Sequence, residues 1–269
     1  MPRSCRTGTI GDDGDVTAPI AIVSAMHEEL RALLPLLQNP TRETLAGREF
    51  HQGSIHGQPV VLVLSGIGKV AAATTAALLV QRFGVGALVF TGVAGGLGAG
   101  VRVGDVVVAQ QLIQHDMDAS PLFPRFEVPL TGRSRFDADA VLADALAAAA
   151  DRCLFGAGPL IGAMKLAELG IQQPRLHRGL VASGDRFVSS HVESDALRAA
   201  LPDVLAVEME GAALAQVCAD FGRPFAVLRT ISDRADDSAH VDFTRFIAEV
   251  ASVYTRVILA DWLAGTALA

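Results

Sequence analysis

The chain has 269 residues, 51% of them hydrophobic, and a formal net charge of −7 at pH 7. This length and composition suffice for a large buried core and predict one globular domain. Because the net charge is negative and Lys and Arg form no cluster, the composition argues against a nucleic-acid partner. The three cysteines are widely spaced without a CxxC motif, which predicts reduced thiols in a cytoplasmic protein and argues against a zinc site.

The N-terminal segment is polar and rich in glycine, and it lacks the apolar stretch of a secretory signal. We therefore expect a disordered extension at 1–18, followed by one domain at 19–265. The longest uncharged run, 83–101, is interrupted by glycines and turn signals, so we interpret it as a strand and a loop. No membrane partner is expected.

Short apolar runs alternate with helical patterns along the rest of the chain. The apolar runs predict strands at 19–24, 50–55, 60–65, 87–91, 105–113, 180–183, 204–207 and 225–231. Helical periodicity and alanine-rich runs predict helices at 26–37, 69–83, 138–150, 191–201, 208–221 and 243–262. The stretch 154–177 fits neither pattern. The alternation predicts an α/β fold, a three-layer single domain with a central twisted mixed β-sheet flanked by helices.

Three acidic residues lie where predicted strands end. Glu29 follows the first strand, Glu210 follows the strand at 204–207, and Asp233 follows the strand at 225–231. Two of them have a structural explanation when taken singly, since Glu210 would complement a helix dipole and Asp233 would cap a turn. Because α/β proteins present their chemistry at the carboxyl edge of the sheet, the three acids together favour a site there.

Other motifs narrow the chemistry. The glycine-rich loops contain neither GxGxxG in a βαβ frame nor GxxxxGK[ST], which argues against dinucleotide and P-loop sites. Strand alternation would place Asp116 and Asp118 on one face and His115 on the other, a poor arrangement for a metal. We expect no metal and no cofactor, and a loop-ordering or interface role for this segment. Separated carboxylates without a metal suit cleavage of a glycosidic bond, in which one acid protonates the leaving group and another activates water.

From residue 20 to about residue 262 the chain resembles the 5′-methylthioadenosine/S-adenosylhomocysteine nucleosidases, which have the nucleoside phosphorylase/hydrolase fold. The resemblance is carried, in order, by AMHEE (25–29), SGIGKVA (65–71), TGVAGG (91–96), GDVVV (104–108), SGDRF (183–187), VEME (207–210) and RTISD (229–233). It implies hydrolysis of the N-glycosidic bond of 5′-methylthioadenosine, S-adenosylhomocysteine or both. The products would be adenine and the thioribose.

The resemblance implies a division of labour among the acids. Glu29 would be the general base for water, and Asp233 the general acid that protonates N7 of adenine. Ser232 would orient Asp233, and Arg229 would lie near the attacking water. Glu210 would accept hydrogen bonds from the ribose hydroxyls.

The resemblance also implies apolar contacts to the substrate. Met209 would pack against the sugar, Phe187 would stack on adenine, and the Val188 backbone would read its amino edge. Two further substrate-binding positions would be Ala94 and Gly95.

Two departures from the family pattern bear on the substrate. Val93, expected at the substrate, stands where the family usually has serine, so one hydrogen bond near the water or sugar is lost. The loop 120–130 differs from the commonest bacterial form. In the family this region crosses a homodimer interface and lines the neighbour's alkylthio pocket, a role that Phe126 or Phe123 would take here. We expect this loop to decide between the two thioether nucleosides.

Three alternatives stay open. A purine nucleoside phosphorylase would need a basic phosphate pocket near the first strand, where Glu28 and Glu29 would repel the anion. A futalosine hydrolase is a second enzymatic alternative. A catalytically silent nucleoside-binding module is a third, and the presence of all three acids counts against it.

Overall fold

The computed structural model describes residues 18–235 and 243–266. Nearly all of the predicted extension at 1–18 therefore lies outside the described residues. Within them, no helix is long and apolar enough to span a membrane.

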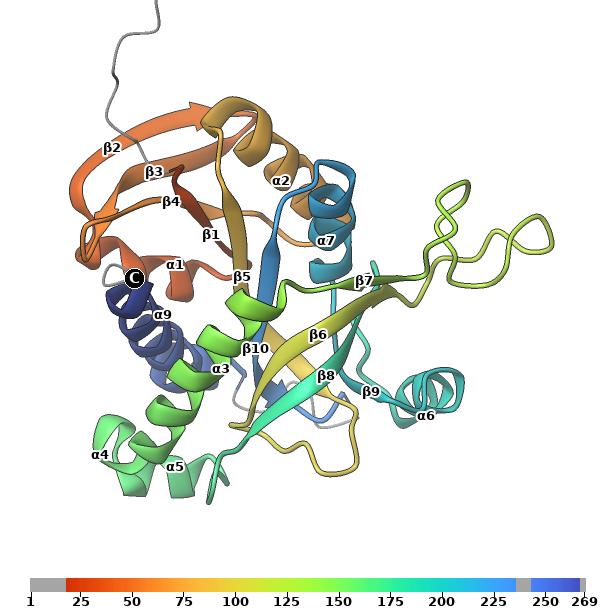
Figure 1. Cartoon of the computed structure of the whole chain (residues 1–269). Helices are drawn as coiled ribbons and strands as arrows, with labels where there is room; N and C mark the ends of the chain where they lie inside the picture. The colour runs from red at the N-terminus through yellow and green to blue at the C-terminus, as the bar shows by residue number, and fades with distance from the viewer. Residues whose placement is uncertain (1–17, 236–242, 267–269) are drawn as a thin grey trace, which may run out of the picture.

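In the described part of the chain, ten strands form one mixed sheet (Figure 1). They are β1 (Ile20–Ser24), β2 (Gln38–Leu45), β3 (Arg48–Ile55), β4 (Gln58–Leu64), β5 (Ala87–Gly96), β6 (Val106–Gln114), β7 (Arg135–Asp137), β8 (Leu176–Ser183), β9 (Val204–Glu208) and β10 (Phe225–Asp233). The strand order is β10-β6-β8-β9-β5-β1-β4-β3-β2, and β10 also pairs with β5. Five strands, β5, β10, β6, β8 and β9, thus close on themselves, while β1 to β4 extend from β5.

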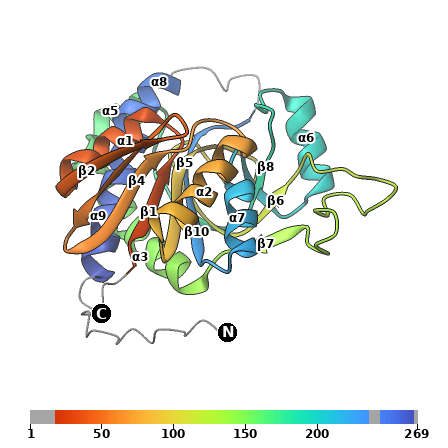
Figure 2. The same cartoon turned by 90° about the horizontal axis from the view of Figure 1, so that it is seen from above.

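Helices cover both faces of the sheet (Figures 1 and 2). They are α1 (His27–Leu33), the 3₁₀ turn η1 (Leu34–Leu36), α2 (Lys69–Phe83), α3 (Ala140–Phe155), α4 (Ala157–Ile161), α5 (Ala163–Glu168), α6 (His191–Ala200), α7 (Gly211–Asp220), α8 (Phe243–Phe246), the π-helical turn η2 (Ile247–Ala251) and α9 (Ser252–Thr266). One apolar core packs α1, α3 and α9 against the sheet, and a second packs α2 and α7 against the other face. On β5, Val89 faces the first core and Phe90 the second, as the twofold alternation of a strand requires.

The predicted fold class is confirmed, and the helix at 69–83 has the predicted bounds. The polar strand β2 was missed because nearly all of its residues are exposed, so it carries no apolar signal. The prediction of a loop at 92–96 is wrong, since these glycines continue β5. The predicted helix at 208–221 begins only at Gly211, and Glu208 ends β9. The stretch 154–177 contains the short helices α4 and α5.

The strand assumed for the segment from His115 to Asp118 is also wrong, because β6 ends at Gln114. The face argument against a metal therefore does not apply to these residues. Among the described residues, no group of three or more His, Cys, Asp and Glu side chains is arranged to hold a metal ion.

Candidate active site

Strand register brings the acid-bearing segments together. Gly95 on β5 is the register partner of Asp233 on β10 and also of Val207 on β9. The strand β1 lies on the side of β5 opposite β10, with Ser24 beside Thr91, so the helix α1 that follows β1 starts at the same end of the sheet. The closure of five strands thus places the ends of β9 and β10 against a single glycine.

A cavity of about 200 Å³ lies at this edge. Nine of the predicted site residues line it: Val93, Ala94, Gly95, Phe187, Val188, Met209, Glu210, Ser232 and Asp233. The lining also contains residues to which no specific role was assigned from the sequence: Ala25, Met26, Ile67, Arg186, Val207, Glu208 and Phe243. Of the predicted residues, Glu29, Arg229 and Phe126 are absent from the lining.

Glu29 is fully buried on α1, three residues after Met26 of the cavity lining, and it contacts α9. Its Oε1 accepts a hydrogen bond from Thr255 Oγ1 at 3.1 Å, and its Oε2 has no hydrogen-bond partner among the described residues. Burial raises the pKa of the Glu29 carboxyl to about 7, although the Arg229 guanidinium and the Thr255 hydroxyl act in the opposite direction. The side chain is therefore a carboxyl that titrates near neutrality.

Asp233 ends β10 and is also largely buried. Its Oδ2 accepts a hydrogen bond from Ser232 Oγ at 2.8 Å, and its Oδ1 accepts one from the backbone N–H of Ala235 at 2.7 Å. Ser232 thus fixes the orientation of this carboxyl, in agreement with the predicted contact. A side chain at position 95 would intrude here, because a Cβ on Gly95 would lie 2.9 Å from Asp233 Oδ1.

Glu210 occupies the N-cap position of α7. Its Oε1 accepts a hydrogen bond from the backbone N–H of Gly68 at 2.9 Å, which ties it to the loop before α2. Burial, and then the negative charge of Glu208, raise the pKa of Glu210 to about 7.

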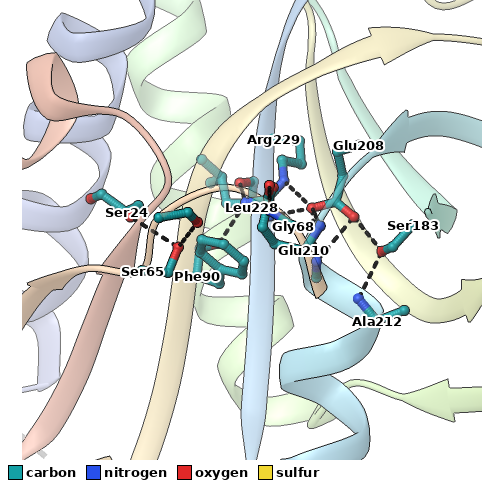
Figure 3. Close-up of polar contacts among 12 residues, drawn as sticks. Ser24, Ser65, Gly68, Phe90, Ser183, Glu208, Glu210, Ala212, Leu228 and Arg229 are labelled. Atoms are coloured by element: carbon teal, nitrogen blue, oxygen red, sulfur yellow. Dashed lines mark hydrogen bonds and ion pairs between the residues drawn. The ribbon is translucent and has the colours of Figure 1, made fainter. Parts of the chain in front are cut away.

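The buried ion pair of Glu208 and Arg229 was missed by sequence reasoning (Figure 3). Arg229 Nη2 lies 2.5 Å from Glu208 Oε2, and both side chains are almost completely buried. Glu208 also accepts hydrogen bonds from the Ser183 hydroxyl and from the backbone N–H groups of Gly211 and Glu210. The pair therefore joins β8, β9 and β10 to the first turn of α7. Arg229 lies inside β10 and Glu208 ends β9, and neither position by itself indicates its partner in the sequence.

The remaining contacts of Arg229 are internal as well. Its Nη1 donates to the carbonyls of Phe90 and Leu228, and its Cζ lies 4.1 Å from the centroid of the Phe90 ring. A Cβ on Gly92 would lie only 3.0 Å from Nη1, so a glycine is needed where β5 passes over this side chain. Arg229 acts on the site through its charge on Glu29.

The loop that carries Phe187 is fixed by a cluster of charged groups. Asp185 Oδ1 accepts from the backbone N–H of Lys69 at 2.7 Å, and the Asp185 N–H donates to Asp116 Oδ2 at 2.9 Å. Lys69 Nζ lies 2.6 Å from Asp116 Oδ1. Asp116 therefore has the loop-ordering role expected for its segment.

Phe126 lies in the long segment between β6 and β7, which extends away from the sheet (Figures 1 and 2). The half-buried ring packs against the apolar cluster that includes Ile113 and Val188 of the same chain. Its backbone N–H donates to the Met117 carbonyl at 2.9 Å.

Fold and site together define the class of protein. The family model described as Phosphorylase superfamily matches residues 19–260. The chain therefore belongs to the phosphorylase superfamily.

Individual relatives narrow the family. The chain is 35% identical over 232 residues to a 5′-methylthioadenosine/S-adenosylhomocysteine nucleosidase of Anoxybacillus flavithermus, a match that covers 86% of this chain and 92% of that protein. It superimposes with a TM-score of 0.78 and 35% identity on the nucleosidase of the same name from Streptococcus pneumoniae, solved with a transition-state inhibitor, over 92% of this chain and 99% of that one. It also matches a futalosine hydrolase mutant of Helicobacter pylori, with a TM-score of 0.76 and 33% identity over 91% of this chain and 98% of that one. Within the superfamily, the chain belongs to the 5′-methylthioadenosine/S-adenosylhomocysteine nucleosidase family.

Proposed function

We propose that the protein hydrolyses the N-glycosidic bond of 5′-methylthioadenosine, S-adenosylhomocysteine or both, releasing adenine and the thioribose. The observation that carries the proposal is that Glu210 and Asp233, from distant segments, line one small cavity, while Glu29 is buried three residues after Met26 of the same lining. The relatives bear the corresponding name, and the cavity provides the groups that such a reaction needs.

Glu29 is the general base of the proposed mechanism. A base works best when its pKa lies near the operating pH, and burial raises the pKa of Glu29 to about 7. Its ionised carboxylate takes a proton from the attacking water, and the positive charge of Arg229 keeps a useful fraction of the group ionised.

Asp233 is the general acid that protonates N7 of adenine as the bond breaks. Its two oxygens are oriented by Ser232 and by the backbone of Ala235, so the carboxyl is held in one position at the cavity wall. Protonation of the leaving group and activation of water each contribute roughly 10²–10⁴-fold to such reactions.

The other lining residues bind the nucleoside. Glu210 accepts hydrogen bonds from the ribose hydroxyls, with Met209 against the sugar. Phe187, which is 44% exposed at the cavity, closes over adenine, and the Val188 backbone reads its amino edge. The apolar side chain of Val93 lines the cavity without a hydrogen-bonding group, and Ala94 and Gly95 complete this wall.

The test is adenine release from each thioether nucleoside by the wild type and by Glu29→Gln and Asp233→Asn. Each substitution preserves shape and removes one proton-transfer group, so each should lower kcat by roughly 10²–10⁴-fold. Glu43→Gln is the control, because Glu43 is an acid on the exposed strand β2 that pairs with Arg82 and does not line the cavity. Wild-type turnover in either site variant contradicts the assigned roles.

A phosphorylase would give a different product. Adenine release that requires inorganic phosphate and yields the thioribose 1-phosphate would establish that alternative. Futalosine is included as a third substrate because one structural relative is described as a futalosine hydrolase mutant. The outcome that supports the proposal is release from the thioether nucleosides in phosphate-free buffer.

We also propose that the protein works as a homodimer in which the loop 120–130 approaches the neighbour's cavity. The loop belongs to the segment that extends from the sheet, and Leu122 and Leu130 are 83% and 90% exposed on it. Light scattering should give a dimer mass, and Leu122→Glu with Leu130→Glu should yield monomers with reduced kcat/KM. A wild-type monomer with full activity contradicts this arrangement.

A further inference from the structure

The C-terminal helix contributes a polar contact to the Glu29 carboxyl. Thr255 on α9 is fully buried, and its Oγ1 lies 3.1 Å from Glu29 Oε1. The Oγ1 of Thr91, on β5, lies 3.0 Å from the same Thr255 oxygen. These three buried side chains come from the beginning, the first third and the end of the chain, and they form one hydrogen-bonded row.

The row has a direction when Glu29 is ionised. A hydroxyl has one proton to donate, and an ionised carboxylate only accepts. If Thr255 donates its proton to Glu29, the proton between the two hydroxyls must come from Thr91. The row then runs from Thr91 to Thr255 to Glu29 Oε1, and each donated bond strengthens the next.

The contact divides the two oxygens of Glu29. Oε1 is held by Thr255, whereas Oε2 is buried and has no partner among the described residues. Oε1 is thus stabilised as a hydrogen-bond acceptor, and Oε2 is the oxygen with an accepting site to spare.

Local helix geometry supports this use of Thr255. The five-residue π-helical turn η2 (Ile247–Ala251) immediately precedes α9, and such wide turns often occur at functional sites because they change which residues face inward. Beyond the turn, the Thr255 hydroxyl contacts Thr91 of the sheet, whereas Val250 and Ile258 on the same helical segment belong to the apolar core.

We propose that Thr255 is a positioning residue for the base: its hydroxyl, oriented by Thr91, holds Oε1 of Glu29 so that Oε2 takes the proton of the attacking water. The inference rests on the proposed hydrolase function. Thr255 is assigned no contact with the nucleoside, and it acts only through Glu29.

Few charged groups compete with this contact. Among the described residues, Arg229 on β10 and Glu28 on α1 are the charged groups that act on Glu29. The strands β1, β4 and β5 contain no charged residue, and Glu249 on η2 is paired with Arg245. A change at position 255 therefore affects the Glu29 carboxyl without rearranging another ion pair.

The experiment is the pH profile of kcat/KM for adenine release from methylthioadenosine, compared between the wild type and Thr255→Val. A hydrogen bond to the ionised carboxylate lowers its pKa, so its loss should move the acid limb of the profile upward by about one pH unit. Below the limb, kcat/KM should fall about tenfold relative to the wild type, and the loss should shrink above it. Thr255→Ser keeps the hydroxyl and should keep the wild-type limb.

Ser252→Ala is the matched control on the same helix. The Ser252 hydroxyl bonds only to the Ala248 carbonyl one turn earlier, so its loss should leave the limb in place. Thr91→Val tests the row from its other end, and it should move the limb in the same direction by a smaller amount. If Thr255→Val does not fold, the position of the acid limb in Thr91→Val tests the role of the row instead.

The outcomes separate this inference from the proposed function. A limb unchanged in Thr255→Val and Thr91→Val, or moved equally by Thr255→Ser, overturns the positioning role even if Glu29→Gln is inactive. Wild-type turnover in Glu29→Gln overturns the function itself. Infrared spectra give a readout without turnover. The difference between the wild type and Glu29→Gln identifies the Glu29 carboxyl band, and this band should titrate at higher pH in Thr255→Val.

Discussion

The buried ion pair of Glu208 and Arg229 makes a prediction about stability that follows directly from its geometry. The substitution Glu208→Gln preserves the volume of the side chain and removes its charge. Arg229, with no exposed surface, could still donate to the amide oxygen and to the Phe90 and Leu228 carbonyls, but no negative charge would face its guanidinium. Removal of one member of a buried pair typically costs about 3–5 kcal/mol because the other charge is left uncompensated.

The same substitution also weakens the start of α7. The Glu208 carboxylate accepts from the backbone N–H of Gly211 at 2.8 Å and of Glu210 at 3.2 Å, and such groups at a helix N-terminus have no partner within the helix. A neutral amide accepts less strongly, so the loss should lie at the upper end of that range. A loss of this size is a large share of the roughly 5–15 kcal/mol by which domains are stable.

Urea unfolding followed by circular dichroism measures the effect. Glu43→Gln is the control, because Glu43 pairs with Arg82 on the surface at 3.1 Å and such pairs contribute about 0–1 kcal/mol. The double variant of Glu208→Gln with Arg229→Met should lose less than the sum of the single variants, since no buried charge is left alone. A loss below about 1 kcal/mol in Glu208→Gln would refute the reasoning.

Further predictions concern pH and packing. Burial raises the pKa of Glu29 and of Glu210 to about 7. The proposed mechanism uses ionised Glu29 to take the proton of water and ionised Glu210 to accept from the ribose hydroxyls, so kcat/KM should fall at least tenfold per pH unit below about 7. A flat profile through this region would argue against both roles. Gly95→Ala should lower kcat strongly while the protein stays folded, because the new Cβ would lie 2.9 Å from Asp233 Oδ1. Gly100→Ala, where a Cβ meets nothing within 4 Å, should leave kcat unchanged, and equal losses in the two variants would count against the packing explanation.

Some of the site could be predicted from the sequence because it depends on local order along the chain. An acid after an apolar strand is a local pattern, so Glu29, Glu210 and Asp233 were identified as a group. The strands β1, β9 and β10, which lead up to these acids, were recognised by their apolar runs. The helix α2 was placed correctly because its alanine-rich run is bounded by Gly68 and Gly84, residues that break helices.

Other parts depend on closure of the sheet, which leaves no local signal. Glu208 was assigned to a helix, since nothing in its surroundings indicates that Arg229 on a distant strand neutralises it. The glycines of β5 suggested a loop, yet they let the strand pass close to Arg229 and Asp233. Ile67 lines the cavity from the loop before α2 and Phe243 from the start of α8, and an apolar residue at either place by itself predicts no contact.

The central claim is hydrolysis of a thioether nucleoside by a Glu29 base and an Asp233 acid. The most direct test is product analysis of purified enzyme incubated with 5′-methylthioadenosine in phosphate-free buffer, with Glu29→Gln and Asp233→Asn assayed beside it. Hydrolysis by these two residues should give adenine and free 5-methylthioribose in equal amounts from the wild type, with the rate in each variant lower by roughly 10²–10⁴-fold. Dependence of adenine release on phosphate, or wild-type rates in the variants, would contradict it.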